Sequence, residues 1–246
     1  MISLKSEREI ELIRKAAEIV HVVLQEIQSA ISPGVKTIVL DRIAERIIDE
    51  RGAIPAFKNY HGFPANICSS INEEVVHGIP SERKLQEGDI VSIDVGVKHE
   101  GYYADAARTW PIGTVDKKVL RLIDVTRSSF FHAIGLIHAG SRLGDLSNAV
   151  QTYVEGHGYS VVRDFVGHGI GQSMHEEPQI QNFGEKGTGP VLKDGMTLAI
   201  EPMVNMGTWR VKILENQWTV VTADDSLSAH YEDTVVVRSD KVEVLT

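Results

Sequence analysis

Two aspartates, Asp94 and Asp105, stand at positions where a carboxylate could take part in chemistry. Asp94 ends the apolar run DIVSID, and Asp105 follows a glycine-bounded turn and a Tyr-Tyr pair. This pattern predicts a strand, a turn and a return strand that bring the two carboxylates side by side. Because a carboxylate resists burial unless a positive charge lies beside it, the pair either reaches solvent or binds a cation together.

Three more residues could join this pair. Glu201 ends the run MTLAIE, Glu232 lies in the strand-like run AHYEDTVVV, and His168 lies between glycines in VGHGIG, where we expect close backbone approach and an imidazole outside the core. Each acid alone is more often solvated, but four carboxylates and an imidazole cannot gather without metal. Two divalent ions that share carboxylates would use all five ligands, and mainly oxygen ligands suit Mn(II), Fe(II), Co(II) or Zn(II).

Apolar periodicity predicts four amphipathic helices, and Ile and Val content predicts strands around the acidic residues. The first predicted helix follows a capping box of Ser6 and Glu9, and the second ends at Gly52. The third spans 116–134, and the fourth spans about 144–155. Residues 53–77 are expected to form loops and short strands. Since no low-complexity linker interrupts the chain, we expect an α/β fold in a single catalytic domain, residues 1–246.

The chain carries an internal repeat. ISPGVKTIVLDRIAERIIDERG, from Ile31, aligns without gaps with IHAGSRLGDLSNAVQTYVEGHG, from Ile137. LQEGDIVSID then mirrors LKDGMTLAIE, and HGI occurs at His77 and again at His168. Three features in the same order make chance a poor explanation, so we expect two related halves, roughly 31–105 and 137–232, with Asp94 and Glu201 in equivalent places.

Composition narrows the class of protein. Hydrophobic residues make up 42% and charged residues 24%, as in ordinary soluble proteins. The net charge of -9 argues against nucleic acid or an anionic membrane as partner, because both need a basic patch. Cys68 is the single cysteine, so no intrachain disulfide can form, and the charged start MISLKSEREIELIRK is not a signal peptide. We expect a cytoplasmic protein.

Six motifs together resemble the type I methionine aminopeptidases of the short bacterial form, from about Glu7 onward. They are NYHGFPANICSSINEEVVHGIP, DIVSIDVG, GYYADAART, VGHGIGQSMHEEPQI, MTLAIEPM and WTVVTADDSLSAHYEDT. The resemblance implies the pita-bread fold, with two pseudo-symmetric α/β halves around a dinuclear metal site. It also implies a metallo-exopeptidase, a hydrolase that removes the N-terminal methionine from nascent proteins with a small second residue, as a monomer acting on polypeptide N-termini at the ribosome.

The resemblance further implies roles for individual residues. The metal ligands would be Asp94, Asp105, His168, Glu201 and Glu232, with Asp105 and Glu232 bridging two ions of Co, Mn, Fe or Zn. Glu201 would also pass protons, and His77 and His175 would contact the substrate, so these three are the expected catalytic residues. The methionine pocket would consist of Phe57, Tyr60, Phe63, Cys68, Met174 and Trp218. Asn72, Glu74 and Ser228 match a site for Na or K. Asp233 stands where the family commonly has His.

Two rival functions differ in class. A dipeptidase or aminopeptidase acting on X-Pro bonds shares the fold and ligands, but usually has a separate N-terminal domain, whereas here the catalytic pattern begins near residue 1. A protein of this fold that has lost catalysis and binds protein or RNA would lose metal ligands, and all five are present here.

Overall fold

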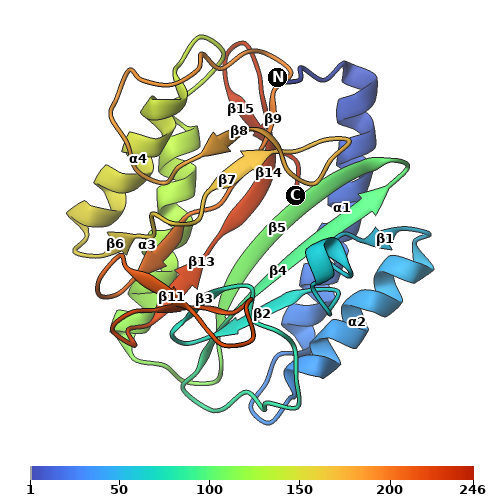
Figure 1. Cartoon of the computed structure of the whole chain (residues 1–246), viewed down its shortest axis with the longest axis vertical. Helices are drawn as coiled ribbons and strands as arrows, with labels where there is room; N and C mark the ends of the chain where they lie inside the picture. The colour runs from blue at the N-terminus through green and yellow to red at the C-terminus, as the bar shows by residue number, and fades with distance from the viewer. Residues whose placement is uncertain (1) are drawn as a thin grey trace.

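The computed structural model describes residues 2–246 and shows a curved, antiparallel β-sheet flanked by two pairs of helices (Figure 1). The helices α1 (Glu7–Ala30) and α2 (Thr37–Glu50) flank one half of the sheet, and α3 (Lys117–Ile134) and α4 (Leu143–Gly156) flank the other. The capping box before α1 is confirmed: the Glu9 carboxylate accepts from Ser6 N at 2.9 Å, and Ser6 Oγ accepts from Glu9 N. All four predicted helices are present.

The main sheet has the strand order β1-β4-β5-β14-β9-β7-β8, with β2 paired to β4 and β15 paired to β14. Two three-stranded sheets, β13-β10-β6 and β11-β12-β3, complete the fold. The strands are β1 (Ile54–Pro55), β2 (Cys68–Ile71), β3 (Glu74–Val76), β4 (Ile90–His99), β5 (Tyr102–Pro111), β6 (Ser160–Val161), β7 (Gly167–Gly169), β8 (Glu176–Ile180), β9 (Thr197–Ile200), β10 (Met203–Asn205), β11 (Val211–Ile213), β12 (Val220–Thr222), β13 (Ser228–His230), β14 (Glu232–Val237) and β15 (Val242–Val244).

The centre of the sheet repeats the symmetry seen in the sequence. The strands β4-β5 and β9-β14 form two antiparallel pairs that meet where β5 and β14 lie side by side. The helix α4 starts 106 residues after α2 and has the same length of 14 residues. An isolated bridge joins Lys36 to Lys84 before α2, and a matching bridge joins Arg142 to Val191 before α4. These correspondences support two related halves.

Each half has its own hydrophobic core, and the cores direct the polar side chains to the space between them. In β4, the side chains of Val91, Ile93, Val95 and Val97 pack into the first core with residues of α1 and α2. Because side chains alternate along a strand, the side chain of Asp94 points to the opposite face, where Gly96 leaves open space. The second core joins α3 and α4 to β9 and β14.

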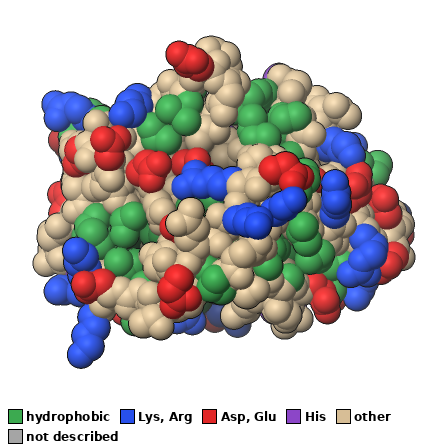
Figure 2. Space-filling view, turned by 90° about the horizontal axis from the view of Figure 1, so that it is seen from below, with side chains coloured by type: hydrophobic (Ala, Val, Ile, Leu, Met, Phe, Trp, Pro, Cys, Tyr) green, Lys and Arg blue, Asp and Glu red, His purple; other side chains and the backbone are tan. Residues whose placement is uncertain are grey.

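The surface carries mixed charge. On the face seen in Figure 2, acidic and basic side chains are interspersed with small hydrophobic areas. Within residues 2–246, no helix combines the length and the apolar character that a bilayer crossing requires.

Candidate metal and substrate site

The register of the central strands brings three carboxylates together. Ala107 on β5 pairs with Asp94 on one side and with Glu232 on the other. Asp105 lies two residues before Ala107 and therefore points to the same face, and its cross-strand partner is Gly96. Ala107 and Gly96 are small, so they leave space on this face of the sheet. The three carboxylates converge at this space.

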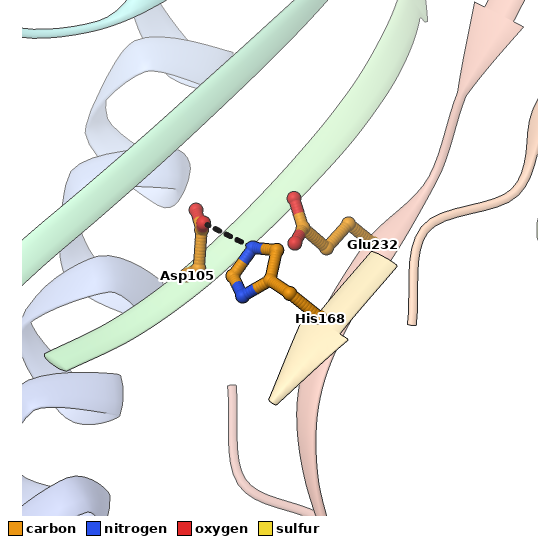
Figure 3. Close-up of side chains that lie close together, drawn as sticks. All are labelled: Asp105, His168 and Glu232. Atoms are coloured by element: carbon orange, nitrogen blue, oxygen red, sulfur yellow. Dashed lines mark ion pairs between the residues drawn. The ribbon is translucent and has the colours of Figure 1, made fainter. Parts of the chain in front are cut away.

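The second half of the chain adds an imidazole and a fourth carboxylate. His168 on β7 pairs with Ala199 on β9, and Glu201 follows the end of β9. His168 Nε2 lies 3.8 Å from Asp105 Oδ2 and 3.8 Å from Glu201 Oε1. One potential ligand atom each from Asp105, His168 and Glu232 lies within 4.8 Å of the others (Figure 3).

The orientation of His168 suits a metal ligand. Its Nδ1 lies 2.9 Å from the carbonyl oxygen of Gly169. Because a carbonyl oxygen can only accept, Nδ1 carries the hydrogen, and Nε2 of the neutral ring presents a lone pair. This lone pair faces carboxylates, which are themselves acceptors, so a cation between them would satisfy every partner.

His168 is buried, with a residue exposure of only 7%, but its ring lines the cavity beside the carboxylates instead of packing in a hydrophobic core. The flanking glycines do allow close backbone approach, as expected: a Cβ on Gly167 would lie 2.4 Å from the carbonyl oxygen of Ala199. That close packing of neighbouring strands is what buries the imidazole.

The electrostatics of the cluster also fit a divalent cation. Burial raises the pKa of Asp94 to about 7 and raises the pKa values of Asp105, Glu201 and Glu232 well above their usual range, with repulsion between the carboxylates adding to the last three. Burial lowers the pKa of His168 to about 3. One oxygen each of Asp94, Asp105 and Glu232 is buried without a hydrogen-bond partner among the described residues. Buried carboxylate oxygens that accept no hydrogen bond need another positive partner. They are the ligand atoms that a divalent ion of the Mn, Fe, Co or Zn kind requires.

A cavity of about 220 Å³ opens onto this cluster. Its lining comprises the five candidate ligands, the two candidate substrate histidines, all six residues of the predicted methionine pocket, and His61: Phe57, Tyr60, His61, Phe63, Cys68, His77, Asp94, Asp105, His168, Met174, His175, Glu201, Trp218 and Glu232. Residues from both halves of the chain therefore meet at one cavity.

The apolar part of the cavity is attached directly to the acidic part. Cys68 on β2 lies opposite Asp94 on β4, and the rings of Phe63 and Trp218 pack edge to face with centroids 5.2 Å apart. Phe57 and Met174 crowd Gly96, where a Cβ would lie 2.7 Å from the ring of Phe57. An apolar side chain in this pocket would lie beside the carboxylates.

The two candidate substrate histidines are neutral at pH 7. Burial lowers the pKa of His77 to about 4, and its backbone has a φ of 60°, a conformation that favours glycine and stores strain. Burial also lowers the pKa of His175, whose ring centroid lies 4.3 Å from that of His168. The Tyr60 hydroxyl lies 2.7 Å from His175 Nδ1, a contact that the sequence did not predict.

His61 and His230 belong to this region and were missed from the sequence. His230 is 2% exposed, and its Nε2 lies 3.8 Å from Glu201 Oε2 without a hydrogen-bond partner in residues 2–246. Its position two residues before Glu232, and thus on the same face of an extended chain, was a signal that could have identified it. His61 contacts Tyr60 with ring centroids 4.4 Å apart, and no local pattern marked it.

The candidate monovalent site lies away from the cavity lining. Ser228 N donates to the carbonyl oxygen of Asn72 at 2.9 Å, so these two residues are neighbours. The Glu74 carboxylate accepts from Arg83 at 2.9 Å and from Ile71 N at 2.8 Å. The side-chain amide of Asn72 donates to the Asp89 carboxylate and accepts from Ile90 N. A cation at these residues stays a prediction.

Comparison with known proteins agrees with this geometry. The model of metallopeptidase family M24 matches residues 11–239. A methionine aminopeptidase of Clostridium perfringens is 52% identical over 246 residues, covering 100% of this chain and 99% of the relative. The solved structure of methionine aminopeptidase from Thermotoga maritima has a TM-score of 0.98 and 46% identity, covering 100% of this chain and 99% of that one. The solved structure of a prolidase from Pyrococcus furiosus has 24% identity and a TM-score of 0.81. The match covers 99% of this chain and 65% of the prolidase chain, and it shows the fold alone. The chain therefore has the pita-bread fold and belongs to metallopeptidase family M24, among the methionine aminopeptidases.

Proposed function

We propose that the chain is a metal-dependent aminopeptidase that removes the N-terminal methionine from nascent proteins and prefers a small second residue. The observation that carries this proposal is the cavity, in which buried acceptor atoms without donors lie next to an apolar pocket. The full-length similarity to methionine aminopeptidases supports it.

Five residues would hold two divalent ions. They are Asp94, Asp105, His168, Glu201 and Glu232, with Asp105 and Glu232 shared between the ions. The family resemblance implies that Asp105 and Glu232 would be the shared ligands, and they lie on the neighbouring central strands β5 and β14. When bound, such ions act as Lewis acids that polarise a carbonyl group and lower the pKa of water.

The protein's own groups would bind the substrate and move protons. The aromatic and sulfur-containing pocket suits the flexible thioether of methionine, and a free amino terminus would lie beside the carboxylates. Glu201 would transfer the proton of the attacking water to the leaving amine. His175 would donate a hydrogen bond to the oxygen that becomes negative in the transition state, and His77 would contact the substrate beyond the scissile bond.

A comparison of peptide substrates tests the activity. The purified protein with Mn(II) or Co(II) should release free methionine from Met-Gly-Met and release nothing from Gly-Pro peptides. Cleavage of Gly-Pro alone would instead identify an X-Pro hydrolase, and no release from either peptide would favour a binding protein.

Metal dependence is tested on the same substrate. Chelation should abolish activity, and Mn(II), Co(II) or Fe(II) should restore it. Asp105→Ala should weaken binding of both ions because it removes a shared ligand. Full activity of this variant, or of metal-free protein, would contradict the proposed chemistry.

The setting of the enzyme belongs to the same proposal. We propose a cytoplasmic monomer whose partners are the N-termini of nascent polypeptides, presented at the ribosome, with neither nucleic acid nor membrane as a ligand. The net charge of -9 and the single cysteine support this setting. A sodium or potassium ion near Asn72, Glu74 and Ser228 is included as a weaker part of the proposal.

A further inference from the structure

A partly buried ion pair, in which only the acid is fully buried, lies next to the candidate metal ligands. Arg108 on β5 and Asp233 on β14 approach to 2.5 Å, and their side chains are 22% and 1% exposed. Neither residue lines the cavity, but Asp233 directly follows Glu232, which does, and Arg108 donates to the Glu232 carbonyl oxygen.

Arg108 contacts three consecutive residues, Tyr231 and the first two residues of β14. Its guanidinium lies 4.3 Å from the ring centroid of Tyr231, donates to the carbonyl oxygen of Glu232, and donates to the Asp233 carboxylate. The planar fork of arginine allows these contacts at the same time. The backbone on both sides of Glu232 is thereby fixed, and with it the point from which the Glu232 side chain starts.

Asp233 extends the same network to Asp105. Its carboxylate also accepts from the Tyr231 hydroxyl at 3.0 Å and from Thr246 Oγ1 at 2.8 Å. Thr246 Oγ1 in turn accepts from Thr234 N at 3.0 Å. Thr234 Oγ1 accepts from Asp105 N and donates to the Asp105 carbonyl oxygen, both at 2.9 Å. The network therefore holds the backbone at both of the carboxylates that would be shared.

Stability alone does not explain such a pair. Removing two charges from water is costly, and replacing a buried ion pair by apolar residues is often neutral or stabilising. Two ionised carboxylates, at Asp105 and Glu232, would repel each other at the site, so their strands need an attachment that holds both backbones in place. Polar partners that orient ligands typically contribute 10–100-fold to metal affinity.

We propose that Arg108 and Asp233 are positioning residues that hold the backbone at Glu232 and Asp105 in the geometry the metal ions require. This inference rests on the proposed metal site. It predicts that loss of the pair weakens metal binding even where the fold is kept.

The test is a titration of metal-free protein with Mn(II), in which calorimetry measures the affinity. The absorption spectrum of the Co(II)-loaded protein is a second readout. Arg108→Met should weaken Mn(II) binding by about 10–100-fold and alter the Co(II) spectrum, because the ligand geometry changes. Arg14→Met is the matched control. It removes the half-buried pair between Arg14 and Glu243, at 2.8 Å with side chains 32% and 31% exposed, and should leave both readouts unchanged.

A double variant separates positioning from stability. Arg108→Met leaves Asp233 unpaired and should lower the melting temperature, whereas Arg108→Met with Asp233→Asn removes both charges and should recover it. Metal affinity should stay low in the double variant, because the contact with the Glu232 carbonyl is still missing. Wild-type affinity and spectrum in the folded double variant would overturn the positioning role. Wild-type protein that binds no Mn(II) would overturn the metal site itself, and the two failures are thus distinguishable.

Discussion

The hydroxyl of Tyr60 contacts Nδ1 of His175 and can either donate to it or accept from it. Burial raises the pKa of Tyr60, so the phenol keeps its hydrogen near neutral pH and can donate to Nδ1 at 2.7 Å. A neutral imidazole that accepts at Nδ1 carries its hydrogen on Nε2. With Tyr60 as the donor, His175 would be prepared to donate a hydrogen bond from Nε2 to a developing oxyanion, and this is the arrangement that the proposed role of His175 requires.

Replacement of Tyr60 by Phe should test this contact while keeping the aromatic wall of the pocket. We expect kcat to fall by about tenfold or more, because the imidazole loses the partner that fixes its tautomer. KM and the bound metal should change little. Steady-state kinetics on Met-Ala-Ser and metal analysis measure these quantities, and an unchanged kcat would show that the hydroxyl has no such role.

The histidines at the cavity should separate into two groups when each is replaced by Ala. His168→Ala should lose metal, because Nε2 faces Asp105 and Glu201. His175→Ala should keep its metal and lose about a hundredfold or more in kcat. His77→Ala should keep its metal and show a smaller defect that includes KM.

Metal content, kcat and KM of the three variants decide the assignment, with His21→Ala on the exposed face of α1 as control. Metal loss in His175→Ala together with retained metal in His168→Ala would reverse the two roles.

At the scale of elements, β4 carries both a ligand and the floor of the methionine pocket. Gly96 lies two residues after Asp94, and a Cβ there would lie 2.7 Å from Phe57 and 3.1 Å from Met174. Gly96→Ala should displace these side chains and raise KM for methionyl peptides several-fold, while Mn(II) affinity is kept. Gly156→Ala, whose Cβ meets nothing within 4 Å, is the control. Unchanged KM would mean that Phe57 and Met174 move aside without effect on the pocket.

Elements were predictable from the sequence where the physical cause is local. The helices follow from apolar periodicity and caps, and Gly52 ends α2 with a φ of 65°. The internal repeat predicted that Asp94 and Glu201 occupy equivalent positions in the two halves. Long-range packing was not predictable: the burial of His168 depends on how β7 lies beside β8 and β9, and the position of His230 near Glu201 depends on where β13 meets the sheet. No local pattern encodes the Tyr60–His175 contact or the Arg108–Asp233 pair.

At the scale of the whole molecule, the stability of the metal-free protein should depend on pH. Folding raises the pKa of Asp94 to about 7 and raises those of Asp105, Glu201 and Glu232. Below the pKa values of the unfolded chain, both states are protonated and folding has no penalty. As pH rises toward 7, the unfolded chain releases protons that the folded chain retains, so folding becomes less favourable.

The melting temperature of metal-free protein should therefore fall relative to that of metal-loaded protein between about pH 5 and 7.5. For a chain of this size, each kcal/mol lost lowers it by about 2–4 °C. Calorimetry of both forms in the same buffers measures the difference. A difference that stays constant across this range would show that folding does not raise the pKa values of these carboxylates.

The division of the ligands between the two halves has a consequence for biosynthesis. Asp94 and Asp105 leave the ribosome early, but β14 must be synthesised before Glu232 can lie beside β5. A growing chain thus exposes aspartates that lack their partners, and it cannot enclose the ions. Metal uptake at the proposed site would therefore be a maturation step that follows the synthesis of β14. An ion would then have to enter a site that is already folded, through the cavity onto which the ligands open.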